Sequence, residues 1–148
     1  ICTPLIAHWP AGIQTSDRWV RDPVHIMDIM PTLCEAAGAN YPRKQKGRDI
    51  QAMEGASLIP AFQGERIAKR SLGFEHQEAR ALRQGPWKAV WSKRMPNKIE
   101  WELYNLDQDR CESRNLANKH AARTAKMAKE WETWAKRVQV FPFFKPKR

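Results

Sequence analysis

SLGFEHQEARALRQGPWKAVW, residues 71–91, is the stretch that decides the fold. It begins a series of short runs of strand-favouring residues, and the clearest turn between them is Gln84-Gly85-Pro86. The four runs span residues 71–75, 79–83, 87–91 and 99–104. Short strands that follow one another through tight turns pair with their neighbours along the chain, so these runs predict an antiparallel meander.

An apolar stripe downstream predicts a helix that covers this sheet. From about Asn118 the pattern is helical, and Met127, Trp131, Trp134 and Val138 recur at spacings of four, three and four residues. This spacing puts the four side chains on one face of a helix. We interpret the stripe as a packing surface rather than as a ligand platform. The predicted fold class is therefore α+β, with a small four-stranded antiparallel sheet packed by a C-terminal helix.

The first apolar run of the chain fits a different kind of sheet. Leu5–Trp9 is typical of a strand buried on both faces of a parallel sheet, and a turn at residues 10–12 ends it. The N–H and C=O groups of such a strand need neighbours that no other run in this sequence supplies. We therefore expect it to join a larger sheet formed outside these residues. By itself it would expose Leu5, Ile6 and Trp9, which favours self-association.

A short helix is predicted to follow that strand. Asp28 is a suitable N-cap, and Pro31 falls in the first turn, where its missing N–H costs nothing. Ile29 and Leu33 would form the apolar face of the helix, and Gly38 would end it. The first part of the chain is therefore expected to form a strand–helix unit.

Polar sequence separates this unit from the meander. Residues 39–55 are rich in Lys and Arg and predict a surface loop. Residues 57–64 predict one or two helical turns, with Ser57 as the cap and Gly64 as the stop. We therefore expect two domains, a strand–helix–loop part over residues 1–65 and a small sheet-and-helix domain over residues 66–148.

The composition predicts a folded and basic protein. Of 148 residues, 42% are hydrophobic and seven are Trp, which argues against wholesale disorder. No run approaches the roughly 20 apolar residues of a membrane span, so we expect no membrane partner. Lys and Arg outnumber Asp and Glu by 26 to 16, and the resulting net charge of +10 attracts polyanions. The basic residues are dispersed, which disfavours a dedicated nucleic-acid surface.

Motifs for metal and nucleotide chemistry are missing from the sequence. It contains no H-E-x-x-H pattern, no G-x-S-x-G elbow and no glycine-rich phosphate loop. Asp107 and Asp109 form an isolated acidic pair, which is typical of a solvated turn. Three cysteines, an odd number, exclude a complete internal disulfide framework. We therefore assign no catalytic residue and no metal ligand to this chain.

One group of residues could bind an anion. Residues 74–83 bring a carboxylate, an imidazole and two guanidinium groups to the predicted hairpin. His76 could orient or donate to an anionic substrate, and Arg80 could hold an oxyanion through two hydrogen bonds. The alternative is cross-strand ion pairing on the sheet, which the spacing alone favours. Glu75, His76 and Arg80 are nevertheless the candidate substrate-binding residues.

Four separated stretches match the pattern of one enzyme family. They are ICTPLIAHWP at residues 1–10, the helix region 24–39 with its D-I-M-P-T-L sequence, LRQGPWK at residues 82–88, and ELYNLDQD at residues 102–109 followed by NLA at 115–117. Any one match is weak, but all four occur in the right order over nearly all of residues 1–142. Together they resemble the C-terminal portion of sulfatases of the arylsulfatase type.

The resemblance implies a fold and an active site. Residues 1–65 would belong to an alkaline-phosphatase-like α/β domain, and residues 66–148 would form the small domain beside the active-site cleft, where Glu75, His76 and Arg80 could line the substrate side. The family uses a formylglycine nucleophile, made from Cys or Ser in a C/S-x-P-S/A-R motif, and a Ca²⁺ ion held by Asp and Asn or Gln ligands. Neither motif is present here, since Cys34 and Cys111 are followed by other residues. Both groups are therefore expected in an N-terminal part upstream of Ile1.

The sequence leads to two hypotheses about the function of the chain, which belong to different classes. The leading hypothesis is a C-terminal fragment of an arylsulfatase-like sulfuric ester hydrolase. It would be inactive alone, contribute fold stability and part of the substrate pocket, and meet a sulfate ester only within the whole enzyme. The alternative is a stand-alone basic module that binds polyanions, such as sulfated glycans or nucleic acid, without catalysis. The sequence assigns no compartment, and a periplasmic or secreted location is compatible with the resemblance.

Overall fold

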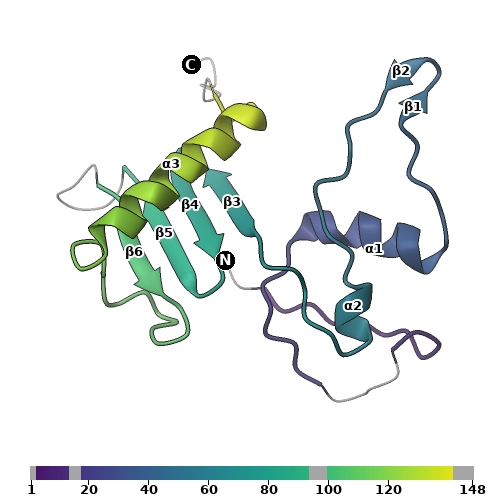
Figure 1. Cartoon of the computed structure of the whole chain (residues 1–148), viewed down its shortest axis with the longest axis horizontal. Coiled ribbons are helices and arrows are strands. Elements are labelled where there is room, and N and C mark those ends of the chain that lie inside the picture. The colour runs from purple at the N-terminus through teal and green to yellow at the C-terminus, as the bar shows by residue number, and fades with distance from the viewer. Residues whose placement is uncertain (1–2, 14–17, 94–99, 142–148) are drawn as a thin grey trace. The chain divides into compact units, whose positions relative to one another are not determined.

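The computed structural model describes residues 3–13, 18–93 and 100–141 of the chain. These residues belong to two compact units, unit 1 within Ile1–Ala68 and unit 2 within Lys69–Arg148. Unit 1 holds short helices and a small hairpin, whereas unit 2 holds a larger sheet and one long helix (Figure 1).

Unit 2 is built on a four-stranded antiparallel sheet in the order β3-β4-β5-β6. The strands are β3 (Ser71–His76), β4 (Ala79–Gln84), β5 (Trp87–Trp91) and β6 (Glu102–Asn105). Each strand pairs with its neighbours along the chain, so that Leu82 lies opposite Gly73 and Ala89, and Ala89 lies opposite Leu103. The predicted meander is confirmed. The expected start of its last strand, at residue 99, lies outside the described residues.

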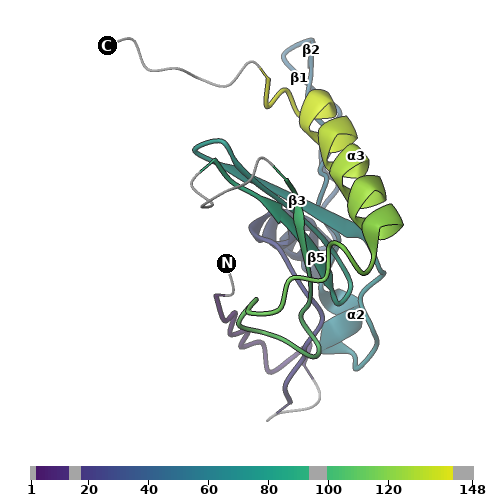
Figure 2. The same ribbon diagram turned by 90° about the vertical axis from the view of Figure 1, so that its left-hand side faces the viewer.

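Helix α3 (Ala121–Arg137) covers one face of this sheet (Figure 2). Met127, Trp131 and Ala135 are fully buried at spacings of four and pack with Leu82 and Leu103 in one core. The indole N–H of Trp131 donates to the Phe74 carbonyl at 2.9 Å, which satisfies the polar atom of a buried ring. The predicted packing role of the helix is therefore confirmed.

Trp134 completes the contact between this helix and the sheet. A Cβ atom on Gly73 of β3 would lie 2.4 Å from a ring carbon of Trp134, far inside van der Waals contact. The glycine therefore makes room for the indole, and a larger side chain at this position would push the helix away. Val138, the last residue of the predicted stripe, is the C-cap just beyond the helix and is half-buried.

In unit 1 the described residues form one short 3-10 helix, two α-helices and a hairpin: η1 (Ile26–Asp28), α1 (Ile29–Ala36), α2 (Ile59–Phe62), β1 (Lys44–Gln45) and β2 (Arg48–Asp49). The C-terminal ends of α1 and α2 follow the predicted glycine signals, whereas the N-cap of α2 is Leu58 and not the predicted Ser57. Gly38 and Gly64 have φ angles of 62° and 96°, and the Ile59 N–H donates to Ser57 Oγ at 3.2 Å. The predicted surface loop over residues 39–55 is largely exposed, but it also contains the β1–β2 hairpin, which the prediction missed.

Asp28 corrects one detail of the helix prediction. Asp28 is the N-cap residue of α1, as predicted, but its side chain makes no capping bond to that helix, because both carboxylate oxygens accept other N–H groups. The carboxylate is fully buried and accepts the N–H groups of His25 at 2.8 Å and Ala56 at 2.9 Å. Thr32 Oγ1 accepts the Leu58 N–H at 2.9 Å. Asp28 and Thr32 therefore connect α1 to the segment before α2.

Residues 5–9 form no strand in the described part of the chain, which does not include the larger sheet that the predicted strand Leu5–Trp9 was expected to join. No strand of the described residues pairs with this segment. The predicted turn at residues 10–12 is present, and in it the Trp9 carbonyl accepts the Gly12 and Ile13 N–H groups at 3.0 and 2.8 Å. A strand cannot persist without a ladder partner for its backbone groups. Ile6 is 91% exposed and Leu5 is also exposed, whereas the Trp9 ring packs edge-on against Phe62.

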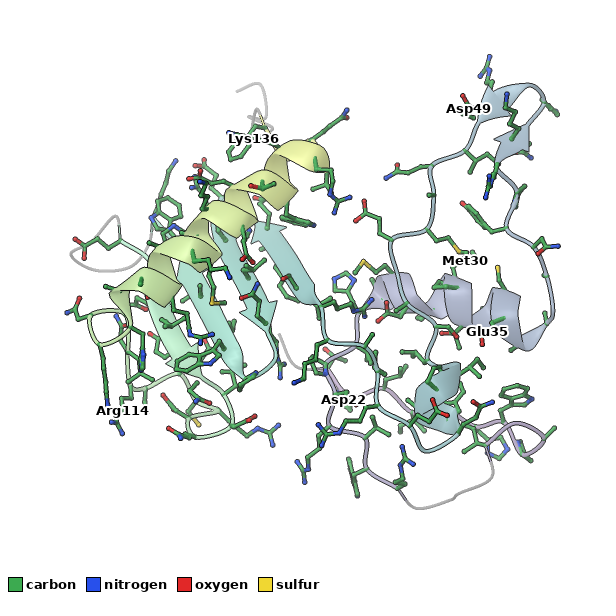
Figure 3. All side chains as sticks on the ribbon, viewed as in Figure 1. Asp22, Met30, Glu35, Asp49, Arg114 and Lys136 are labelled. Carbon is green, nitrogen blue, oxygen red and sulfur yellow. The ribbon has the colours of Figure 1, made fainter. Side chains whose placement is uncertain are left out.

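The predicted apolar face of α1 forms but is not buried. Ile29 is 42% exposed, Leu33 is 58% exposed and Met30, labelled in Figure 3, is also exposed. Pro31 and Thr32 are the buried residues of this helix. Across the described residues, no helix has the length and apolar character needed to cross a membrane.

Candidate functional site

The hairpin between β3 and β4 carries the candidate substrate-binding residues. Its two turn residues, Gln77 and Glu78, have φ angles of 50° and 69°, a conformation in which glycine or asparagine is preferred. The Glu78 N–H donates to Glu75 Oε1 at 2.8 Å, and the Glu78 carboxylate forms an ion pair with Lys93. The left-handed conformation costs a residue other than glycine roughly 1–2 kcal/mol. The two contacts stabilise the turn against this cost.

Arg80 lies on the face of the sheet that α3 covers. It is the cross-strand partner of Glu75 and of Trp91. Its guanidinium carbon is 4.2 Å from the centre of the Trp91 ring system and 5.0 Å from that of Trp131. Stacking of this kind on partly desolvated rings contributes about 1–2 kcal/mol. Arg80 is thus held between aromatic side chains of its own unit.

His76 lies on the other face of the sheet. Neighbouring residues of a strand point to opposite faces, so His76 points away from the side shared by Glu75 and Arg80. It is exposed. The structure therefore brings Glu75 and Arg80 together and separates His76 from them, so the three do not form one binding face.

A polar cluster on the face of His76 was not assigned a role from the sequence. Lys88 Nζ forms an ion pair with Glu112 Oε1 at 2.5 Å, and the lysine side chain is only 12% exposed. Tyr104, the cross-strand partner of Lys88, donates its hydroxyl to Glu102 Oε2 at 2.6 Å. The pKa of Tyr104 is raised above its ordinary value. Burial is the largest cause, and the hydrogen bond to Glu102 is the second. The phenol stays protonated and acts as a donor.

The loop after β6 is ordered by residues of the fourth matching stretch. The Asp109 carboxylate accepts the Arg114 N–H at 2.7 Å and the Ser113 hydroxyl at 3.1 Å, and hydrogen bonds from the Arg114 and Ser113 N–H groups hold its pKa below the ordinary value. Asn115 Oδ1 accepts the Leu103 N–H at 3.2 Å and also that of Ala117. Arg114 marks this loop in Figure 3. These residues therefore shape and anchor the loop.

The described residues do not provide a metal site. They contain no group of three or more His, Cys, Asp or Glu side chains that could hold a metal ion. Cys34 is half-buried and Cys111 is exposed, and both are free thiols. A Ca²⁺ ion of the kind implied by the resemblance does not fit any side-chain cluster in this part of the chain.

Comparisons with curated proteins identify relatives. No family model matches the chain. A protein described as an uncharacterized sulfatase from Schizosaccharomyces pombe is 37% identical over 124 residues, 79% of this chain and 22% of the relative. A sulfatase from Formosa agariphila is 29% identical over 126 residues, 76% of this chain and 22% of the relative. Human arylsulfatase D is 33% identical over 64 residues, 43% of this chain and 10% of the relative.

Solved structures give the same family. The crystal structure of Ps i-CgsB matches with a TM-score of 0.61 and 27% identity, over 76% of this chain and 24% of that one. Its complex with k-i-k-neocarrahexaose matches with a TM-score of 0.57 and 25% identity, over 73% and 23%. The structural neighbours are sulfatases with the alkaline-phosphatase-like fold. The chain spans about a fifth of the length of its first relatives, in their C-terminal portion.

Proposed function

Because the chain is related to the C-terminal portion of sulfatases, we propose that it forms the C-terminal part of an arylsulfatase-like enzyme that hydrolyses sulfuric esters. The observation that carries this proposal is the 37% identity over 124 residues to the sulfatase from Schizosaccharomyces pombe. The order of the sheet, with α3 on one face, supports it through the match to a solved sulfatase at a TM-score of 0.61.

The chain alone is inactive in this proposal. The nucleophile and the Ca²⁺ ligands would come from residues outside this sequence, since the nucleophile motif does not occur in it and the described residues hold no group of three or more His, Cys, Asp or Glu side chains that could bind a metal ion. When present, such a nucleophile and cation supply attack on the sulfate and stabilisation of its oxygen charges. The contribution of this chain is a stable small domain and part of the wall of the substrate pocket.

His76 is the residue of this chain that we assign to the substrate side. It is exposed, and an imidazole can donate a hydrogen bond to a sulfate oxygen. Glu75 and Arg80 would act as positioning residues, since Glu75 accepts an N–H of the turn and Arg80 stacks on Trp91. Glu75 and Arg80 would then stabilise the β3–β4 hairpin, and His76 on the same hairpin would contact the substrate.

The proposed ester is a sulfated saccharide. The support is the oligosaccharide k-i-k-neocarrahexaose bound to Ps i-CgsB, which is 25% identical to this chain. A second function, binding of polyanions without catalysis, is favoured by the net charge of +10. It predicts affinity that falls steeply with salt concentration and no effect of the chain on turnover.

A chimera tests the main proposal. The matching C-terminal segment of the Formosa agariphila sulfatase is replaced by this chain, and hydrolysis of 4-methylumbelliferyl sulfate and release of sulfate from sulfated oligosaccharides are measured with Ca²⁺ present. We expect turnover by the chimera and none by the enzyme truncated before this segment or by this chain alone. A chimera that does not fold, or that folds without turnover, contradicts the proposal, as does hydrolysis by this chain alone.

The role of His76 is tested in the same chimera. His76→Ala should raise KM for the sulfated oligosaccharide while leaving the melting temperature unchanged, because an exposed side chain contributes little to stability. The control is His8→Ala, which removes another exposed histidine, in unit 1. Equal KM values for the two variants would remove His76 from the substrate side.

A further inference from the structure

Unit 1 carries a basic hairpin that none of the roles above uses. Strands β1 and β2 pair Lys44 with Asp49 and Gln45 with Arg48, and the Ile50 N–H donates to the Arg43 carbonyl at 2.9 Å, which extends the ladder by one pair. The turn residues Lys46 and Gly47 have φ angles of 49° and 77°, as a two-residue hairpin turn requires. The backbone of the hairpin is therefore regular, and its basic side chains are exposed.

The charges of the hairpin are distributed unequally between its two faces. Alternation puts Lys44 and Asp49 on one face, where their charged groups pair at 3.6 Å. It puts Arg43 and Arg48 on the other face as diagonal neighbours, roughly 7–8 Å apart at Cα. Among the described residues, the side chains of Arg43 and Arg48 have no ion-pair partner. One face is thus neutralised, and the other presents two guanidinium groups to solvent.

A hollow lies at the base of this hairpin. Its volume is about 560 Å³, and its lining includes Tyr41, Arg43, Ile50 and Met53. Asp49, labelled in Figure 3, also borders it, with its carboxylate paired to Lys44. An aromatic ring and apolar side chains suit the apolar face of a sugar ring, while a guanidinium at the edge suits an oxyanion.

We propose that the β1–β2 hairpin and its hollow bind a sulfated saccharide chain, with Tyr41 beneath a sugar ring and Arg43 and Arg48 each holding a sulfate group. The choice of saccharide rests on the proposed function, whereas the choice of an anion rests on the two guanidinium groups alone. A single-stranded nucleic acid is disfavoured, because it stacks successive bases on several aromatic side chains and the lining of the hollow includes one aromatic residue.

The test is equilibrium binding to the full chain at two salt concentrations. The probes are a heparin-derived hexasaccharide, its desulfated counterpart and a single-stranded DNA of matched charge. We expect binding of the sulfated hexasaccharide only, and a Kd about tenfold or more higher for the double variant Arg43→Gln/Arg48→Gln, since two charge-assisted contacts are lost. The matched control is Arg110→Gln/Arg114→Gln, which removes the same charge from exposed positions of unit 2. Its Kd should change by less than about twofold.

Three outcomes overturn this proposal. The first is no binding of the sulfated hexasaccharide. The second is an equal loss of affinity in both double variants, which indicates general charge attraction. The third is tighter binding of the DNA than of the hexasaccharide, which indicates a nucleic-acid surface. The binding experiment involves no turnover, so it can succeed where the chimera fails. Conversely, a chimera that hydrolyses 4-methylumbelliferyl sulfate while the hexasaccharide does not bind would reject the hairpin site and leave the proposed function standing.

Discussion

Unit 2 buries nearly all of its large apolar side chains, whereas unit 1 leaves many of its own exposed. In unit 2, Trp131, Met127 and Leu103 are fully buried between α3 and the sheet, and Phe141 is the exposed large apolar residue among those described. Unit 1 exposes nine such residues: Leu5, Ile6, Trp19, Val20, Ile26, Ile29, Met30, Leu33 and Tyr41. Exposed large apolar side chains are available for contact with other protein surface. The two units therefore differ in how fully they bury their large apolar side chains.

The most severe test of this comparison is Trp131→Ala. Loss of a fully buried indole, together with its hydrogen bond to the Phe74 carbonyl, should lower the free energy of unfolding by about 3–5 kcal/mol. The matched control is Trp19→Ala in unit 1, whose ring is 85% exposed and whose loss should change stability by less than about 0.5 kcal/mol. Urea unfolding monitored by circular dichroism measures both. Similar losses for the two variants would contradict the contrast between the units.

Asp28→Ala tests how much structure unit 1 has by itself. The change leaves the buried N–H groups of His25 and Ala56 without their acceptor, which should cost about 2–3 kcal/mol within unit 1. Hydrogen exchange should then show lost protection at Ala56, with the amides of β4 unaffected. Asp49→Ala, which removes an exposed carboxylate, is the control. Full retention of protection at Ala56 would mean that the buried carboxylate does not organise this unit.

Arg80→Gln separates a positioning role from a substrate contact. The guanidinium stacks on Trp91 and Trp131, so its loss should destabilise unit 2 by about 1–2 kcal/mol. Arg110→Gln, at an exposed position, should have no measurable effect. Thermal unfolding compares the two variants. In the chimera, a raised KM for Arg80→Gln without any loss of stability would contradict the positioning role and assign Arg80 to the substrate.

The parts of the fold that sequence predicted are those with local periodicity. The strands β3 to β5 and the stripe on α3 follow from spacings within a few residues. The aromatic environment of Arg80 depends on Trp131, about fifty positions further along the chain, so no local pattern reveals it. The alternative interpretation of the candidate site was cross-strand ion pairing on the sheet. The structure makes Glu75 and Arg80 cross-strand neighbours, which is a register and not in itself an ion pair.

The differences between the sequence-based predictions and the structure lie mainly in unit 1. Leu5–Trp9 has the composition of a buried strand, but strand formation requires a partner, and the described residues supply none. The apolar face predicted for α1 forms, and it is exposed in the described part of the chain. The hairpin β1–β2 was missed although Lys46-Gly47 carries a turn signal, because its strands are only two residues long and have no apolar alternation.

Tyr104 predicts a pH dependence confined to unit 2. Burial and Glu102 raise its pKa in the folded state. The contribution of the protonated Tyr104 to the free energy of unfolding is therefore fully present below the unfolded pKa of about 10, and it is lost as the pH rises above that value. The melting temperature should fall at alkaline pH more steeply for the parent protein than for Tyr104→Phe. Parallel pH profiles of the two proteins would show that the phenol does not contribute.

The smallest effect on stability is expected for Ile29→Ser/Leu33→Ser on α1. Both side chains are exposed, so the double change should alter the free energy of unfolding by less than about 0.5 kcal/mol per residue. It should nevertheless reduce self-association measured by sedimentation velocity, because the variant has less apolar surface to bury between molecules. Leu82→Ser, on the buried face of β4, is the opposite control and should unfold unit 2. Destabilisation of the double variant by more than about 1.5 kcal/mol would mean that this face of α1 is already packed, and the contrast between the two units would then fail.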